Sequence, residues 1–84
     1  MLKHRDVIRL AFAVGQAVYD RRTELGISQT ELARRVGMTQ ADLSRLELGV
    51  ITPTVAMLAR LARAMESELN LKLVGETSVV AFRA

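Results

Sequence analysis

Side chains that hydrogen-bond, rather than nucleophiles or metal ligands, form the clearest chemical pattern in this sequence. A helix through residues 40–45 would place an amide, a methyl, a hydroxyl and a guanidinium on one outer stripe: Gln40, Ala41, Ser44 and Arg45. A Gln amide can pair bidentately with adenine, an Ala methyl can pack on the methyl of thymine, and an Arg guanidinium can pair bidentately with guanine. The stripe therefore predicts contacts with base edges in the major groove of DNA.

These side chains also have ordinary alternative roles. Gln40 and Ser44 could simply face solvent. Arg45 could form a surface ion pair with Asp42 or Glu47. A good bidentate contact favours the correct base over a wrong one by about 1–3 kcal/mol. The base preference in DNA binding therefore distinguishes base reading from these surface roles.

The sequence offers few candidate residues for catalysis or metal binding. The sequence has one His, His4, and no Cys. It has no Gly-rich loop after a strand and no pair of acids placed in a pocket. Without thiolates, neither a disulfide framework nor a thiolate metal site can form. We therefore expect no enzyme, no cofactor and no metal site.

Two helix starts lie close together in residues 28–48. Ser-Gln-Thr-Glu at 28–31 and Thr-Gln-Ala-Asp at 39–42 are N-terminal capping motifs, each worth about 1 kcal/mol. Between them, the small Ala33 allows close approach and Gly37 can take the positive φ of a sharp turn. Four apolar residues would seal the angle: Leu32, Val36, Leu43 and Leu46. The pattern predicts a helix-turn-helix, with two core helices of an ordinary α-bundle as the alternative.

The flanking helices follow from apolar spacing. Apolar residues at steps of three and four predict a helix over residues 6–25. This helix has a second apolar face, formed by Ile8, Phe12, Gly15 and Tyr19. A helix with two apolar faces usually packs against two elements. Another helix is expected over residues 53–67, with Thr52 as its cap and Pro53 as its first residue. Its predicted buried residues are Val55, Leu58, Leu61, Ala62 and Met65.

The apolar period changes to two after residue 68. Leu69, Leu71 and Leu73 alternate with polar residues, which predicts a half-buried strand. Residues 75–78 suggest a turn, and residues 79–82 could form a second strand or a flexible tail. A lone strand or hairpin has little stability in water, so it needs the helical body or another copy of itself.

Charge favours a polyanionic partner. The 84 residues suit one small domain of net charge +3. Residues 1–65 carry ten Lys or Arg against six acids, whereas residues 66–84 carry two against three. Arg predominates and pairs with phosphate bidentately, although a merely solvated surface is the alternative. Asp6 and Asp20 argue against a membrane-surface helix over residues 3–22. No span or secretion signal is expected, which indicates a cytosolic protein.

Residues 27–49, ISQTELARRVGMTQADLSRLELG, resemble the Cro/phage-repressor (XRE-type) helix-turn-helix family. The resemblance runs from about residue 21 to residue 65. It implies a mostly α, four- to five-helix lambda-repressor-like DNA-binding domain with a short C-terminal β-strand or hairpin. The sequence departs from the family pattern at Leu48, which is often Asn, and at Val50, which is often Lys or Arg.

The same resemblance assigns roles to individual residues. It implies base reading by Gln40, Ala41 and Arg45. It implies backbone or supporting contacts by Gln29, Thr39 and Ser44. It also implies a partly buried ion pair between Arg22 and Glu47, which would tie the first helix to the end of the recognition helix.

The segment Met65-x-x-Glu-Leu-x-Leu-x-Leu resembles the ending of HipB/HigA-type antitoxins. It implies a helical DNA-binding part, residues 1–68, and a part for dimerisation or partner binding, residues 69–84. Leu69, Leu71 and Leu73 would pair across a two-fold axis or cover their own helices.

We therefore expect a sequence-specific repressor that binds a palindromic operator in double-stranded DNA as a homodimer. The antitoxin resemblance adds a cognate toxin as a second partner. The alternatives are a free-standing phage-type or restriction-controller regulator, and a toxin-neutralising interaction module whose DNA binding is incidental.

Overall fold

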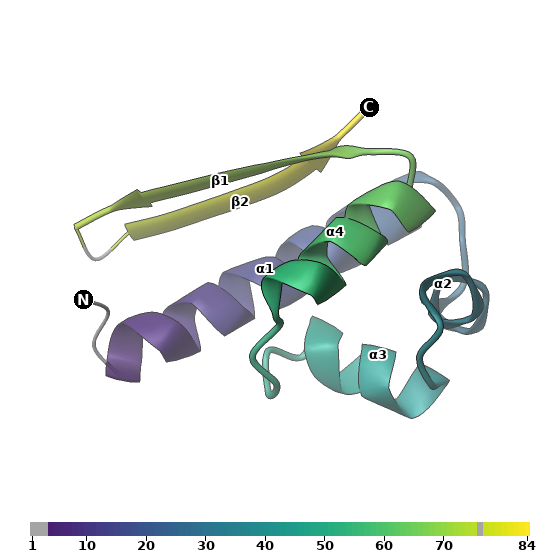
Figure 1. The fold of residues 1–84 in the computed structure, drawn as a ribbon, viewed down its shortest axis with the longest axis horizontal. Coiled ribbons are helices and arrows are strands. Elements are labelled where there is room, and N and C mark those ends of the chain that lie inside the picture. Colours follow the sequence, from purple (N-terminus) through teal and green to yellow (C-terminus); the bar gives the residue numbers. More distant parts are fainter. Residues whose placement is uncertain (1–3, 76) are drawn as a thin grey trace.

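The computed structural model describes residues 4–75 and 77–84. In these residues four helices precede a hairpin: α1 (His4–Glu24), α2 (Gln29–Val36), α3 (Gln40–Glu47), α4 (Val55–Ala64), β1 (Glu68–Val74) and β2 (Thr77–Arg83). Figure 1 shows the hairpin above α1 and α4, with α3 on the opposite side. The long α1 contacts both β2 and α3, although Ile8, Phe12 and Tyr19 of its second apolar face are 53%, 63% and 47% exposed. The expected mostly helical fold with a C-terminal hairpin is confirmed.

Side-chain caps begin α2 and α3 where the sequence predicted them. Ser28 Oγ accepts a hydrogen bond from the amide of Glu31, and Thr39 Oγ1 accepts one from the amide of Asp42, both at 3.0 Å. Between the helices Gly37 has φ +80°, a conformation that costs little only for glycine. The turn between α2 and α3 is therefore determined by local chemistry.

The start of α4 differs from the prediction. Thr54 has an extended backbone, and its side chain accepts the amide three residues later. Thr52 and Pro53 precede this cap, so the prediction of a helix capped by Thr52 is wrong. Either Thr could cap in isolation, and the choice depends on packing that the local sequence does not reveal. One consequence is that Val55, predicted to be buried, opens the helix and is 83% exposed.

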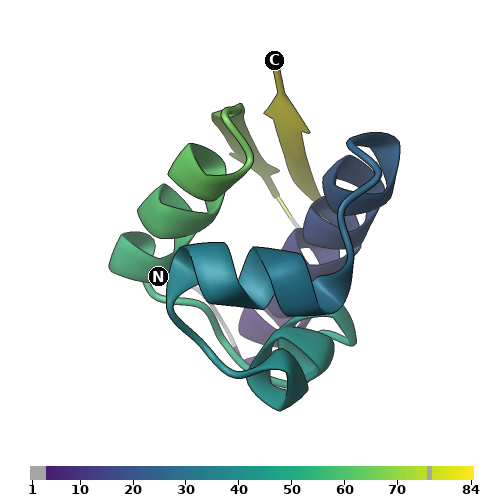
Figure 2. The ribbon, with the colours of Figure 1, turned by 90° about the vertical axis from the view of Figure 1, so that its right-hand side faces the viewer.

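The core draws side chains from all four helices and from β2. Its largest fully buried members are Leu32, Leu43, Leu46, Leu61, Met65, Val14 and Val18. Phe82 of β2 joins the same cluster at 6% exposure. Figure 2 shows the helices and hairpin surrounding this centre end-on. No helix in the described part of the chain has the length and hydropathy to cross a bilayer.

The two strands pair antiparallel, so the second strand rather than a tail is observed. Leu69 lies opposite Phe82, and Leu71 opposite Val80. Leu69 and Val80 are partly buried against the core. Leu71 and Leu73 remain 46% exposed each. The hairpin therefore covers its own helices at one end and leaves apolar side chains open further along.

The helices α1 and α3 approach each other closely at Gly15. A Cβ atom placed on Gly15 would lie 2.4 Å from the carbonyl oxygen of Leu46 and 2.8 Å from that of Glu47. No side chain fits at these distances, so Gly15 sets the spacing between α1 and the end of α3.

We expect Gly15→Ala to destabilise the protein, although Ala stabilises an open helix by about 1 kcal/mol relative to Gly. The added methyl would overlap backbone oxygens, and overpacking of this kind costs about 1–3 kcal/mol. Urea denaturation followed by circular dichroism measures the free energy of unfolding. The exposed neighbour Gln16, changed to Ala, is the control. An increase in stability for Gly15→Ala would contradict the close approach.

Candidate nucleic-acid interface

The helix α3 turns its predicted reading residues outward. Leu43 and Leu46 are fully buried at 0% exposure and fix the rotation of the helix. Gln40, Ala41 and Arg45 lie on its exposed side. The stripe predicted from spacing is therefore accessible to a large partner.

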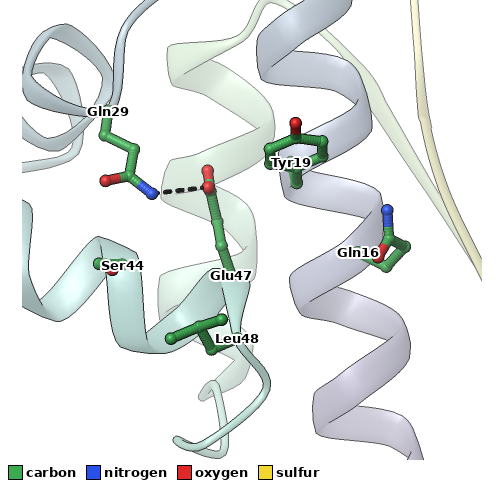
Figure 3. Close-up of a pocket in the computed structure, with 6 residues that line it drawn as sticks. All are labelled: Gln16, Tyr19, Gln29, Ser44, Glu47 and Leu48. Atoms are coloured by element: carbon green, nitrogen blue, oxygen red, sulfur yellow. Dashed lines mark hydrogen bonds between the residues drawn. The ribbon is translucent and has the colours of Figure 1, made fainter.

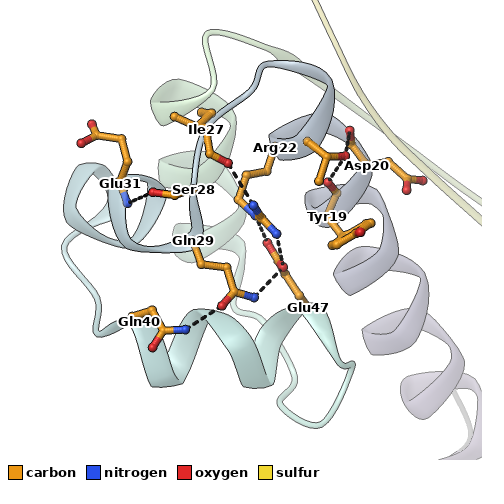
Figure 4. Close-up of polar contacts among 10 residues, drawn as sticks. Tyr19, Asp20, Arg22, Ile27, Ser28, Gln29, Glu31, Gln40 and Glu47 are labelled. Carbon is orange, nitrogen blue, oxygen red and sulfur yellow. Dashed lines mark hydrogen bonds and ion pairs between the residues drawn. The ribbon is translucent and has the colours of Figure 1, made fainter.

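An ion pair joins the end of α1 to the end of α3. Arg22 Nε lies 2.7 Å from Glu47 Oε2, and Arg22 Nη2 lies 3.0 Å from Glu47 Oε1. The side chains are only 11% and 4% exposed. Arg22 Nη1 donates to the carbonyl of Ile27 at 2.9 Å, and the ring of Tyr19 lies 5.4 Å from the guanidinium carbon. The hydrogen bond to Glu47 raises the pKa of Arg22 above its ordinary value despite burial. Figure 4 shows these contacts.

This buried carboxylate also sets the direction of two glutamine amides. Glu47 can only accept, so Gln29 points Nε2 toward it, 2.9 Å from Oε1. Oε1 of Gln29 then faces Gln40, whose Nε2 donates to it at 2.6 Å (Figure 4). Gln40 keeps its carbonyl oxygen and a second N–H for an external partner, which is the pair that adenine requires.

Arg45 forms the surface pair that was its alternative role. Its Nη2 donates to Asp42 Oδ1, and the two side chains are 55% and 46% exposed. Hydrogen bonding to Arg45, and secondarily to Thr39, lowers the pKa of Asp42. Exposed pairs contribute little to stability because solvent screens them, so a guanine can compete for this guanidinium.

Two of the supporting residues, Gln29 and Ser44, border a shallow cavity of about 270 Å³ between α1 and α3. Ser44 is half-buried and lines it with Gln29, while Gln16 and Tyr19 contribute from α1 (Figure 3). Thr39 is exposed, and its Oγ1 is occupied as a helix cap.

Sequence reasoning missed Gln16 and Tyr19 as neighbours of this site. It assigned Tyr19 to an apolar face and gave Gln16 no role. The available signal was spacing, because Tyr19 lies one helical turn before Arg22 and therefore on the same side.

Positive charge on α2 is partly neutralised within the helix. Glu31 pairs with Arg34 at 2.6 Å and with Arg35 at 2.8 Å. The hydrogen bond from Arg34, followed by that from Arg35, lowers the pKa of Glu31 to about 2. The carboxylate is therefore ionised at neutral pH. Among the described residues, no group of three or more His, Cys, Asp or Glu side chains is arranged to hold a metal ion.

Comparison with known proteins adds a family and several relatives. The helix-turn-helix family profile matches residues 18–71. An HTH-type transcriptional regulator of Methanothermobacter thermautotrophicus is 41% identical over 51 residues, which cover 61% of this chain and 74% of that protein. The ImmF control region 10 kDa protein of Bacillus phage phi105 is 34% identical over 67 residues, which cover 80% and 74%.

Solved structures with similar folds include two bacterial regulators. The clp gene regulator ClgR from Corynebacterium glutamicum has a TM-score of 0.67 at 30% identity, covering 68% of this chain but only 61% of its own. The restriction-modification controller protein C.AhdI from Aeromonas hydrophila has a TM-score of 0.64 at 27% identity, covering 67% of this chain and 85% of its own.

Removing one partner of the buried ion pair should lower the free energy of unfolding much more than removing both. Glu47→Ala leaves a buried guanidinium unpaired, which costs about 3–5 kcal/mol. The double variant Arg22→Met with Glu47→Leu should be less destabilised than the sum of its single variants, because no charge is stranded. Urea denaturation measures all of them. Glu24→Ala, which removes an acid 68% exposed, is the matched control. Equal effects of Glu47→Ala and Glu24→Ala would refute the coupling.

Proposed function

This chain belongs to the Cro/phage-repressor (XRE-type) helix-turn-helix family of DNA-binding transcriptional regulators, and from that premise we propose that it represses transcription by binding a palindromic operator as a homodimer. The family match covers residues 18–71, which include the whole of α2, α3 and α4. We also propose that the protein acts on DNA in the cytoplasm and has no enzymatic activity.

One observation carries the assignment of the reading residues. The amide of Gln40 is oriented from within the protein, through Gln29, by the carboxylate of Glu47. Next to it lie the exposed methyl of Ala41 and the exposed guanidinium of Arg45. An oriented amide, a methyl and a guanidinium form a direct-readout set for adenine, thymine and guanine. We assign base reading to these three side chains of α3.

Backbone and supporting contacts are assigned to the ends of the helices. Thr39 and Gln29 stand at helix N-termini, where backbone amides favour phosphate. Ser44 lines the cavity beside α1. These residues would fix the register of α3 in the groove rather than choose the sequence.

A single copy of α3 is too short to specify an operator. Its eight residues extend over about 12 Å, enough to face only a few base pairs. Two copies related by a two-fold axis would read half-sites centred about 34 Å apart, one turn of DNA. The dimer in the proposal supplies this second copy.

We expect Arg45→Ala to relax base preference at one position in each half-site and to weaken operator binding by about 1–3 kcal/mol. Selection of bound duplexes from a random pool, read by sequencing, gives the preference at every position. Arg63→Ala removes the same charge from the exposed side of α4 and is the matched control. A selected motif that is unchanged by Arg45→Ala would refute its reading role.

The same selected duplex separates a true regulator from an interaction module with incidental DNA binding. Each phosphate contact made by Lys or Arg releases counterions, so either kind of binding should weaken with salt, but only a regulator should prefer the selected duplex over a scrambled one. A sequence-independent and uniformly weak interaction would favour the interaction module.

A second candidate function is an antitoxin that represses its own operon. The observation that favours it is the hairpin, where Leu71 and Leu73 remain half-exposed on β1. Together with Leu69 they are candidates for the contact with a toxin, and their expected role in dimerisation stays a prediction. The restriction-modification and phage control relatives favour a free-standing regulator instead.

Co-expression with the neighbouring open reading frame decides between these two forms. For an antitoxin, that frame alone should arrest growth, and its product should co-purify with this chain. Leu71→Glu should then reduce co-purification while operator binding persists. If the frame is harmless and its product does not co-purify, the free-standing regulator is supported.

A further inference from the structure

An exposed apolar surface adjoins the C-terminal end of α3. Ile8 and Phe12 of α1 are 53% and 63% exposed, and Leu48 and Val50 of the loop after α3 are 66% and 65% exposed. We call these four residues the α1–loop surface. None of the proposed base-reading residues of α3 is among these four, so the surface is available to a partner other than the base edges.

Contacts at Gly49 bring the two parts of this surface together. A Cβ atom placed on Gly49 would lie 2.8 Å from the Cα of Phe12 and 3.2 Å from its Cδ2. The loop therefore runs directly against α1 beside the Phe12 ring. Leu48 and Val50 flank Gly49 in the chain, while Ile8 precedes Phe12 by four residues and shares its helix face. The four side chains thus belong to one neighbourhood.

We infer that the α1–loop surface is the dimer interface and that its occupant is a second copy of this chain. The inference rests on the proposed function, because it names the surface through which two copies of α3 are joined. Four large side chains, exposing on the order of 100 Å² each, give about 400 Å² of apolar area. That is about half of the 800 Å² that each partner contributes to a standard interface, and a polar rim can supply the remainder.

The position of the surface suits two-fold pairing on DNA. Glu47, the last residue of α3, is followed directly by Leu48 of the surface. Half-sites about 34 Å apart require each α3 to lie about 17 Å from the two-fold axis, and α3 is only about 12 Å long. An axis through the α1–loop surface would lie beside the C-terminal end of α3, and the packed side chains of the two surfaces would hold the two helices apart.

The hairpin is less well placed for the same task. Both ribbon views show it on the opposite side of the molecule from α3 (Figures 1 and 2). Pairing through Leu71 and Leu73 alone would place the axis on that far side and separate the reading helices further. A duplex does not suit the α1–loop surface either, because its four apolar side chains offer no donor to phosphate.

The experiment is sedimentation equilibrium of the full chain without DNA. We expect the wild type to dimerise at micromolar concentration. Phe12→Glu and Leu48→Glu should each raise the dimer dissociation constant about tenfold or more. Leu25→Glu is the matched control, because Leu25 is 41% exposed just after the other end of α1. It should leave the constant unchanged, as should Leu71→Glu on the hairpin.

Circular dichroism shows whether each variant is folded. Should Phe12→Glu lose its helical signal, Ile8→Ser tests the same surface by the same criterion. A monomeric wild type, or dissociation by Leu71→Glu but not by the variants of the α1–loop surface, would overturn the inference.

Binding to a palindrome recovered from a random pool distinguishes this inference from the proposed function. If the wild type dimerises through the α1–loop surface but selects no duplex, the proposed function fails and the interface stands. If the wild type binds its duplex, and the variants of this surface dimerise as well as the wild type does, the interface fails and the DNA-binding role stands.

Discussion

The buried pair of Arg22 and Glu47 is the interaction on which the geometry of the reading surface depends. It connects the end of α1 to the end of α3 with little access to water. A buried pair adds little net stability, because removing two charges from water costs free energy. Leaving either partner unpaired in the interior costs more. The pair therefore favours the observed position of α3, because a position that separated Arg22 from Glu47 would leave a buried charge unpaired.

The same carboxylate extends this control to the protein surface. Gln29 and Gln40 are long and flexible, and an isolated pair of amides could be arranged in either direction. Because Glu47 accepts only, the polarity of both amides is determined from within. Arg45 differs, because its partner Asp42 is itself exposed. The surface thus combines one amide oriented before binding with one guanidinium that changes partner on binding.

Local chemistry explains which features the sequence predicted. The caps at Ser28 and Thr39 and the turn at Gly37 depend on residues within a few positions of one another, and all three appear where expected. The choice between Thr52 and Thr54 depends on distant packing, and there the prediction was wrong.

Features that the sequence could not predict depend on contacts between residues that are far apart in the chain. The burial of Phe82 requires β2 to lie on α1, and the closeness of Gly49 to α1 requires the whole loop to be in place. The Glu47–Gln29–Gln40 series requires knowledge of amide direction, which spacing does not contain. By contrast, Arg22 and Glu47 were paired through family resemblance, and the outward stripe of α3 followed from the helical period alone.

The place of Phe82 in the core has a consequence for biosynthesis. Phe82 belongs to the same buried cluster as Leu43 and Leu46, which hold α3 in position. A ribosome makes α3 well before it makes β2, so the helices leave the exit tunnel with one wall of their core missing. Native packing around α3 can be completed only after residue 82 has left the ribosome and β2 is free to join the helices.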